Sequence, residues 1–411
     1  MNQKIDMDSI LKFVRRKDLW DKHIESWSSI EEIIEDKEIT LSPSVLEFTP
    51  LGKLTMSSNI ITKLILRKIN SIICNIYKVK QSNRNYITHD LKNLLLDSTP
   101  VFIFKTDIRS FYESVKNKKL LGRLLRDKIV SFEIMEYIRV ILSDKTVGLP
   151  RGLNTSASLS ELYMREFDAK IKLMNDVGYF ARYVDDIIVI FYTRNNLSTE
   201  LAGQELNRKM SIIKSELSKL ELEINHRKTY AFYIPSKGHL HTFIFSNKNG
   251  GCFLLKPGTS KDVIYFDYLG YRYKLDINHK LSLSIAKNKI NKIKSRIFNS
   301  FLLFKYDKNF DILEKRIKYL FSNHLIYEND SDRLYAGIYY NYSQCDPDGK
   351  FLESMECFYN KILKSNKGYL LDIQYKALRK ISVTAGFIKR IVEPFSHNDI
   401  QKILSGLKCY E

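Results

Sequence analysis

The chain has 411 residues, enough for two or three subdomains but too few for three large domains. Its 66 Lys and Arg outnumber 47 Asp and Glu, and the net charge of +19 indicates a partner that carries many phosphates. The five cysteines form no Cys-x-x-Cys pair, which argues against a zinc site and a disulfide framework. No apolar run approaches the roughly 20 residues that a membrane helix needs, so we expect a cytoplasmic protein without a membrane partner.

The beginning of the chain is predicted to be helical. Apolar residues recur at helical spacing from Asp8 to about Ile34, from Ile60 to Tyr77 and from Tyr86 to Leu96. Two basic residues, Lys80 and Arg84, precede the first predicted strand and have the length and charge to contact phosphates.

The first predicted strand ends in an acidic residue. The apolar run from Val101 leads to Asp107, and two aromatic residues, Phe111 and Tyr112, follow. An Asp after a strand is usually a turn former or a helix cap. A loop of turn residues, Gly148 to Ser156, then opens a helical segment from Ala157 to Ile171.

The most informative segment is Arg182–Phe191, in which β-branched and aromatic residues flank Asp185 and Asp186. This pattern predicts a β-hairpin with both aspartates at its tip. Mg²⁺ binds well to one or two carboxylates combined with substrate phosphates, so the tip is a candidate metal site. Taken alone, an Asp-Asp pair is also a common surface turn.

The remaining segments follow in a clear order. Residues 220–229 contain Lys228, and residues 230–267 include Asn-Gly between apolar runs, the strongest short-range signal for a hairpin. From Ser284 the pattern predicts a long basic helix, and further helices are predicted over residues 310–323, 351–365 and 370–381. The basic face of the long helix either follows a nucleic-acid backbone or simply meets water.

These blocks occur in the order found in the palm of a reverse transcriptase, and the chain resembles that family from about Arg84 to Tyr273. The segments 107–115 and 159–163 resemble bacterial defence-associated reverse transcriptases, including abortive-infection systems and the type 3 antiviral system in which two polymerases work together. The chain departs from the related retron and intron enzymes at Arg151, where they carry Gln, and at Leu153-Asn154, where they carry Ser-Pro.

The resemblance implies an α+β fold of the right-hand polymerase type, with fingers, a palm built on an antiparallel sheet, and an α-helical thumb. Residues 1–100 are expected to form N-terminal helices and fingers, 101–115 and 148–275 the palm, and 116–147 a return to the fingers. Residues 230–267 are expected to be a hairpin insertion, and 284–411 the thumb and C-terminal region.

The resemblance also implies an RNA-directed DNA polymerase that acts in defence against phage with two Mg²⁺ ions. Expected partners are an RNA template, in particular a dedicated non-coding RNA, the DNA product, dNTPs, and a second polymerase subunit or further copies of the chain. The implied catalytic residues are Asp107, Asp185, Asp186 and Lys228, and the implied metal ligands are the three aspartates and the Ile108 carbonyl. The implied nucleotide contacts are Lys80, Arg84, Tyr112 and Arg151; the primer grip is Leu269, Gly270 and Tyr271; and Lys289, Lys292 and Arg296 contact nucleic acid.

Structural alternatives stay open for several of these residues, since Tyr112 also suits a core aromatic and Lys228 an exposed lysine at a strand end. Two functional alternatives also stay open: a template-independent or protein-primed polymerase, and a non-catalytic RNA-binding scaffold. The presence of all three flanked carboxylates argues against the scaffold. We expect no RNase H activity, because no acidic cluster follows the predicted thumb region.

Overall fold

The computed structural model describes residues 3–14, 60–143, 147–195, 197–247, 253–328, 333–347 and 349–407. The chain divides into two compact units. Unit 1 comprises residues 1–83 and 98–261, and unit 2 comprises residues 84–97 and 262–411. Of the helix predicted from Asp8 to about Ile34, residues 8–14 lie within the described residues. Helix α1 (Met7–Leu11) confirms its beginning, but residues 12–14 are not helical, so the prediction is wrong there.

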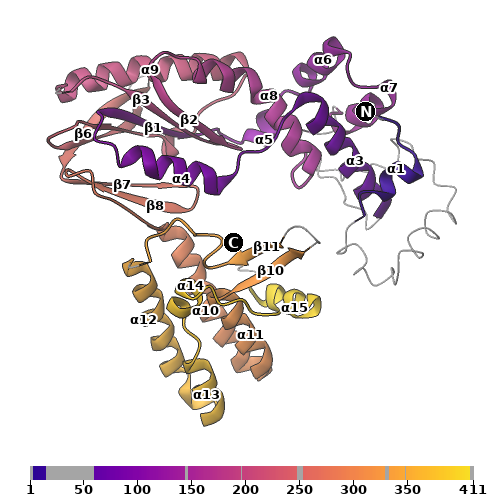
Figure 1. The fold of residues 1–411 in the computed structure, drawn as a ribbon, viewed down its shortest axis with the longest axis vertical. Helices are drawn as coiled ribbons and strands as arrows, with labels where there is room; N and C mark the ends of the chain where they lie inside the picture. Colours follow the sequence, from indigo (N-terminus) through magenta and orange to yellow (C-terminus); the bar gives the residue numbers. More distant parts are fainter. Residues whose placement is uncertain are drawn as a thin grey trace. The chain divides into compact units, whose positions relative to one another are not determined.

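Unit 1 is built on a six-stranded sheet with the order β2-β3-β1-β4-β5-β6 (Figure 1). The strands are β1 (Val101–Asp107), β2 (Val177–Tyr183), β3 (Asp186–Tyr192), β4 (Tyr230–Ile234), β5 (Leu240–Asn247) and β6 (Phe253–Lys261). Every pair is antiparallel. The predicted strand before Asp107 and both predicted hairpins of this unit are confirmed, and the second hairpin extends the sheet through β4.

Helices of unit 1 bury one continuous core against this sheet. They are α3 (Ile60–Tyr77), α5 (Phe111–Ser114), α6 (Asn117–Asp127), α7 (Phe132–Ile141), α8 (Asn154–Lys172) and α9 (Thr199–Lys219). The apolar face predicted for residues 60–77 is confirmed, because Ile61, Leu64, Ile65, Ile69, Ile72 and Ile73 are fully buried. Helix α8 packs on both α3 and β2, so it connects the helical part of the unit to the sheet.

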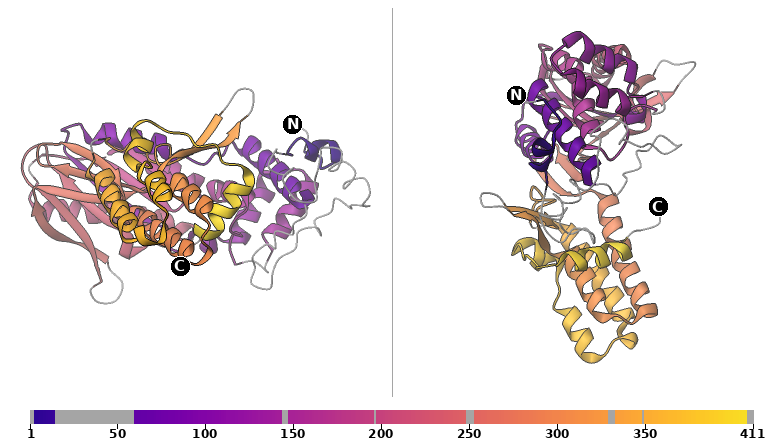
Figure 2. Two further views of the ribbon diagram at one scale, coloured as in Figure 1. Left: turned by 90° about the horizontal axis from the view of Figure 1, so that it is seen from below. Right: turned by 90° about the vertical axis from the view of Figure 1, so that its right-hand side faces the viewer.

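Unit 2 combines small sheets with a bundle of helices. Its elements are α4 (Arg84–Leu95), β7 (Val263–Tyr268), β8 (Tyr271–Asp276), β9 (Leu281–Ile285), α10 (Lys287–Asp307), α11 (Phe310–Phe321), β10 (Asn323–Glu328), β11 (Arg333–Gly337), α12 (Lys350–Ser365), α13 (Asp372–Arg379), α14 (Val383–Ile388) and α15 (His397–Leu407). Helix α10 packs against α11 and α12, and the three run side by side in Figures 1 and 2.

Two further predicted boundaries are wrong. The helix predicted over residues 310–323 ends at Phe321, and Asn323 begins strand β10. The long helix was expected to begin at Ser284, but Ser284 and Ile285 end strand β9, and α10 begins at Lys287. Along β9 the side chains of Leu281, Leu283 and Ile285 are buried while the serines between them are half-buried. This alternation has the period of a strand, and pairing with β8 outweighs the helical spacing that follows. The subdomain boundaries of the hand stay a prediction.

Candidate active site

The ends of two neighbouring strands bring the three predicted carboxylates to one edge of the sheet. In the antiparallel register of β1 and β3, Asp107 lies directly opposite Asp186. The backbone N–H of Ile108 donates to the carbonyl of Asp185 at 3.0 Å, so the turn that carries the Asp pair is tied to the end of β1. Asp107 and Asp186, which are 79 positions apart in the sequence, therefore converge because the strand register requires it.

The turn between β2 and β3 consists of Val184 and Asp185. Val184 has φ = 59°, in the left-handed region where a β-branched residue is strained. The Cβ of an L-residue in this region costs about 1–2 kcal/mol, and two-residue hairpins with positive φ at the first position usually have Gly there. The rest of the structure must therefore hold this peptide in place.

Burial and mutual repulsion both act on the acidic pair. Burial raises the pKa of Asp186 to about 6, although the nearby Lys105 ammonium works in the opposite direction. Burial also raises the pKa of Asp185, and the negative charge of Asp107 adds to the effect. Burial and the neighbouring carboxylates both disfavour the charged forms of Asp185 and Asp186, and a bound cation would offset both effects.

Side chains from the segment after α9 contact Asp107 directly. The Lys228 ammonium lies 3.1 Å from one carboxylate oxygen of Asp107, and the Asn225 amide donates to the other at 3.1 Å. The backbone N–H of Asn225 also donates to the Asp107 carbonyl at 2.6 Å. The hydrogen bond to Asp107 raises the pKa of Lys228, which keeps this lysine protonated at neutral pH. Asn225 was not predicted as a site residue, because an amide beside a lysine is not distinctive in a sequence.

The donor set fits Mg²⁺. Within the described ranges, no three acidic, histidine or cysteine side chains are gathered closely enough to hold a metal alone. Mg²⁺ does not need such a cage, since it usually retains waters and combines one or two carboxylates with substrate phosphates. Asp107, Asp185, Asp186 and the Ile108 carbonyl offer hard oxygen ligands of this kind.

A second group of predicted residues lies where α5 meets the loop before α8. The N–H of Leu149 donates to the Tyr112 carbonyl at 2.8 Å, and Gly148 has φ = 69°. A Cβ at Gly148 would lie 2.1 Å from the same Tyr112 carbonyl oxygen, so only glycine allows this approach. The loop is thereby fixed against Tyr112.

Arg151 is held on this loop by an acidic residue that was not predicted as part of the site. Its Nε and Nη2 atoms donate to the two carboxylate oxygens of Glu113 at 2.5 and 2.9 Å, and its guanidinium lies 5.8 Å from the centre of the Tyr112 ring. The negative charge of Asp185 helps to raise the pKa of both Arg151 and Tyr112, although the largest causes are the Glu113 hydrogen bond and burial respectively. Tyr112 and Arg151 are therefore within electrostatic range of the acidic turn.

The other two predicted nucleotide contacts fall in different units. Lys80 is exposed in the segment between α3 and α4 of unit 1. Arg84 begins α4 in unit 2, where its guanidinium lies 5.3 Å from the ring centres of both Tyr271 and Tyr342 and donates to the Asn341 carbonyl. These contacts involve residues far along the chain and could not be read from sequence. The phosphate-binding roles of Lys80 and Arg84 stay predictions.

The predicted primer grip forms the tight turn between β7 and β8. Leu269 and Gly270 both have positive φ, 49° and 82°, as a two-residue hairpin with matching twist requires. Tyr271 is fully buried, and burial raises its pKa to about 12. Lys289 and Lys292 are exposed on the first half of α10, whereas Arg296 is half-buried. The nucleic-acid contacts assigned to this hairpin and helix stay predictions.

An antiparallel sheet with carboxylates at the end of one strand and on the adjacent hairpin, joined to separate helical parts, is the α+β architecture of a right-hand nucleic-acid polymerase. The model of the family "Reverse transcriptase (RNA-dependent DNA polymerase)" matches residues 47–273, more than half of the 411 residues. The chain therefore belongs to the reverse transcriptase family, whose members are RNA-directed DNA polymerases.

Solved structures similar to this chain include two telomerases. Apo telomerase from Candida tropicalis is 13% identical with a TM-score of 0.36, and the alignment covers 84% of this chain and 53% of the telomerase. Telomerase from Candida albicans, in complex with the TWJ fragment of telomeric RNA, is 14% identical with a TM-score of 0.35, covering 84% and 50%. The chain thus spans about half the length of these structures. No curated protein sequence matches the chain.

Among the helices that the structure describes, none combines the length and apolar character required to cross a membrane.

Proposed function

We propose that the protein is an RNA-directed DNA polymerase that adds deoxynucleotides to a primer 3′ end and releases pyrophosphate. The observation that supports it most strongly is the convergence of Asp107 and the Asp185–Asp186 pair at the ends of β1 and β3. Raised pKa values of Asp185 and Asp186 add to this support, because carboxylates that repel one another attract cations. Membership of the reverse transcriptase family supports the RNA template and the deoxynucleotide substrate.

Asp107 and Asp185 are proposed to hold two Mg²⁺ ions, with help from Asp186 and the Ile108 carbonyl. When bound there, such ions would supply positive charge that stabilises the reacting phosphoryl oxygens. The protein has little covalent work to do, since phosphoryl transfer depends on positioning and on neutralising charge. Because the carboxylates are buried, their mutual repulsion is stronger than it would be in water. A bound cation that offsets this repulsion therefore gains more free energy.

Lys228 is proposed to donate a proton from Nζ to the leaving pyrophosphate. Its pKa is raised by the hydrogen bond to Asp107, so the ammonium form is the resting state. Tyr112 is proposed to lie under the sugar and exclude a 2′-hydroxyl, and Arg151 to contact the nucleotide. Lys80 and Arg84 are proposed to contact the triphosphate.

The template-primer is proposed to contact the β7–β8 turn and the basic face of α10, through Lys289, Lys292 and Arg296. The net charge of +19 supports a polyanionic partner.

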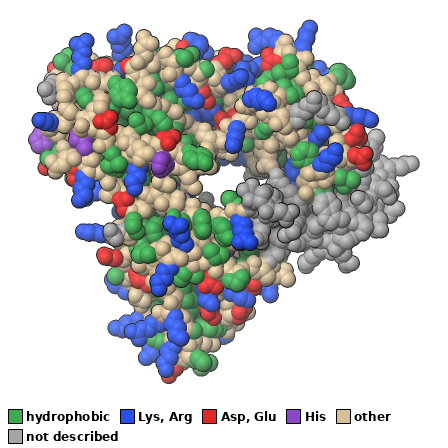
Figure 3. Space-filling model, viewed as in Figure 1, with side chains coloured by type: hydrophobic (Ala, Val, Ile, Leu, Met, Phe, Trp, Pro, Cys, Tyr) green, Lys and Arg blue, Asp and Glu red, His purple; other side chains and the backbone are tan. Residues whose placement is uncertain are grey.

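Figure 3 shows Lys and Arg side chains gathered at the end of unit 2 that carries α13, where Lys361, Lys364, Lys376, Arg379 and Lys380 are exposed.

The activity is tested by incubating purified protein with a primed RNA template, dNTPs and Mg²⁺. Asp107→Ala and Asp185→Ala should abolish extension, while Asp90→Ala, which removes an exposed carboxylate from α4, should leave the rate unchanged. Extension that continues without any template would favour the template-independent alternative. A DNA product covalently attached to the protein would favour protein priming. Extension that survives in Asp107→Ala would overturn the proposed mechanism.

We further propose a role in defence against phage, with a dedicated non-coding RNA as template and with a second polymerase subunit or further copies of the chain as partners. The support is the resemblance of residues 107–115 and 159–163 to defence-associated reverse transcriptases. Sequencing the RNA and DNA that copurify with the protein should yield one dominant RNA and its complementary DNA. Cells expressing the wild-type protein should resist phage and cells expressing Asp185→Ala should not; protection that survives this change would favour the RNA-binding scaffold.

A further inference from the structure

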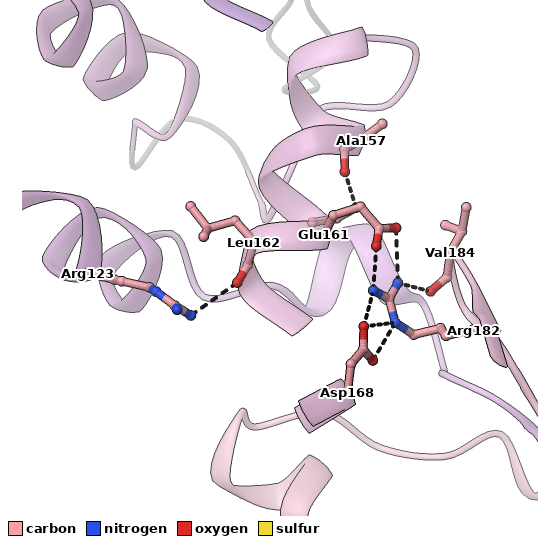
Figure 4. Close-up of polar contacts among 8 residues, drawn as sticks. Arg123, Ala157, Glu161, Leu162, Asp168, Arg182 and Val184 are labelled. Carbon is pink, nitrogen blue, oxygen red and sulfur yellow. Dashed lines mark hydrogen bonds and ion pairs between the residues drawn. The ribbon is translucent and has the colours of Figure 1, made fainter. Parts of the chain in front are cut away.

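Arg182, the next-to-last residue of β2, is a buried cation between two carboxylates of α8 (Figure 4). Its side chain is only 2% exposed. Asp168 accepts from Nε at 2.9 Å and from Nη2 at 2.8 Å. Glu161 accepts from Nη1 at 3.1 Å and from Nη2 at 2.5 Å. Below, Arg182, Glu161 and Asp168 are called the Arg182 cluster.

The remaining donor of the guanidinium reaches the acidic turn. Nη1 also donates to the carbonyl of Val184 at 2.9 Å. That carbonyl belongs to the peptide that joins Val184 to Asp185, so fixing its direction fixes the plane from which the Asp185 side chain departs. This is the peptide that follows the strained φ of Val184. The guanidinium thus holds the strained turn by its backbone.

Only arginine can make this set of contacts. A guanidinium has five N–H donors in a rigid fork, and here each is used: one to Asp168 from Nε, two from Nη1 to Glu161 and Val184, and two from Nη2 to Glu161 and Asp168. A lysine would keep the charge but offers three donors from one atom and cannot reproduce the fork.

Stability alone does not explain the Arg182 cluster. It buries two carboxylates with one cation, and burial raises the pKa of Glu161 despite the attraction of Arg182. Desolvation often cancels the Coulombic gain of a buried ion pair, so apolar residues of similar volume would stabilise the fold as well or better. What apolar residues cannot provide is a directed donor to the Val184 carbonyl.

Helix α8 also reaches the nucleotide side of the site. It begins at Asn154, directly after the loop that carries Arg151, and its Ser160 is close enough to Tyr112 to lower the pKa of that hydroxyl against the larger, raising effect of burial. Glu161 follows Ser160, and Asp168 lies two turns further along the helix. One rigid helix therefore contacts Tyr112, the Arg151 loop and, through Arg182, the acidic turn.

We infer that the Arg182 cluster is a positioning device that sets the direction of Asp185 for metal binding and couples the acidic turn to the nucleotide-binding loop through α8. Its residues touch neither metal nor substrate, so they act through Asp185. The inference rests on the proposed function, in that Asp185 is taken as a metal ligand.

The test compares Arg182→Lys and Glu161→Gln with a matched control, Lys209→Met. Lys209 is also a buried cation of unit 1, and it contacts Asp176, Glu205 and the Phe191 ring. Asp176 and Phe191 lie at the end of the β2–β3 hairpin opposite the turn, so none of these residues belongs to the turn. Three quantities are measured on each full-length protein: the thermal midpoint, Mn²⁺ binding by electron paramagnetic resonance without nucleotide, and the Mg²⁺ dependence of single-nucleotide addition corrected for active fraction.

Arg182→Lys should weaken Mn²⁺ binding by about 10-fold or more, as loss of a residue that orients a metal ligand does. It should also lower kcat by about 10²-fold, with a much smaller change in the KM for dNTP. Glu161→Gln, which keeps an acceptor but loses a charge, should give a smaller effect in the same direction. Lys209→Met should change the thermal midpoint but neither metal binding nor kcat.

If Arg182→Lys does not fold, the inference is tested with Glu161→Gln alone. Mn²⁺ binding and corrected kcat equal to wild type in a folded variant would overturn the inference and leave the cluster a stabilising ion pair. If the wild-type protein binds Mn²⁺ but extends no primer, the proposed function fails while the metal-binding comparison still tests the cluster.

Discussion

At the scale of single residues, Tyr112 is the residue whose identity should govern the choice of sugar. It is half-buried, its position is fixed by Leu149 and Gly148, and it lies near Asp185. Tyr112→Ala should raise the efficiency of ribonucleotide relative to deoxynucleotide incorporation by about 10-fold or more, because the steric barrier to a 2′-hydroxyl is removed. Tyr112→Phe should keep the selectivity. The measurement is the ratio of kcat/KM for dGTP and GTP, and an unchanged ratio in Tyr112→Ala would make this tyrosine a packing residue.

Lys228 gives a second prediction at this scale. Lys228→Met should lower the rate of nucleotide addition by about 10²-fold with little effect on primer binding, since a general acid contributes to the transition state. The solvent isotope effect on the rate should shrink in the same variant. Arg227→Met, which removes the neighbouring exposed cation, is the control and should stay close to wild type. Equal losses in both variants would point to a general electrostatic effect.

At the scale of elements, most strands and helices could be predicted, because their periodicity is local. The hairpin around Asp185 and the helix after the Gly148 loop are confirmed, whereas Ser284 and Ile285, the last two residues of β9, were wrongly assigned to the following helix. The contacts that organise the site were not predictable. Asn225 meets Asp107 across 118 positions, and Glu113 meets Arg151 across 38. Such pairs follow from strand register and loop packing, which leave no periodic signal.

His324 on strand β10 leads to a prediction about how stability depends on pH. His324 is buried, its ring stacks on Tyr319 with centroids 4.6 Å apart, and burial lowers its pKa below 6.5. The unfolded chain therefore binds a proton more readily, so the free energy of unfolding should fall as the pH drops below about 6.5. The thermal midpoint of unit 2 should therefore fall as the pH is lowered from about 7.5 to 5.5. His324→Phe keeps the stacking and should remove part of this dependence; an identical pH profile in both proteins would contradict the prediction.

At the scale of the whole molecule, the excess of positive charge should appear as salt dependence. Each lysine that neutralises a phosphate adds roughly 0.7–0.9 to the slope of log K against log salt concentration. Replacing both Lys289 and Lys292 by Ala should therefore lower the slope by about 1.5. The control replaces Lys119 and Lys170, which pair with Glu221 and Glu216, and should leave the slope nearly unchanged. Equal slopes in the wild type, the Lys289 and Lys292 double variant and the control would exclude α10 from the nucleic-acid contact.

The end of β1 and the β2–β3 turn are together proposed to hold a pair of cations. Crystals of the protein grown with Mn²⁺, a primed template and a non-reactive dNTP analogue provide the most direct measurement, through the anomalous scattering of manganese. We expect two manganese peaks roughly 3.5–4 Å apart, both within bonding distance of Asp107 and Asp185. Peaks that contact only one of these aspartates, or no peak between them, would contradict it.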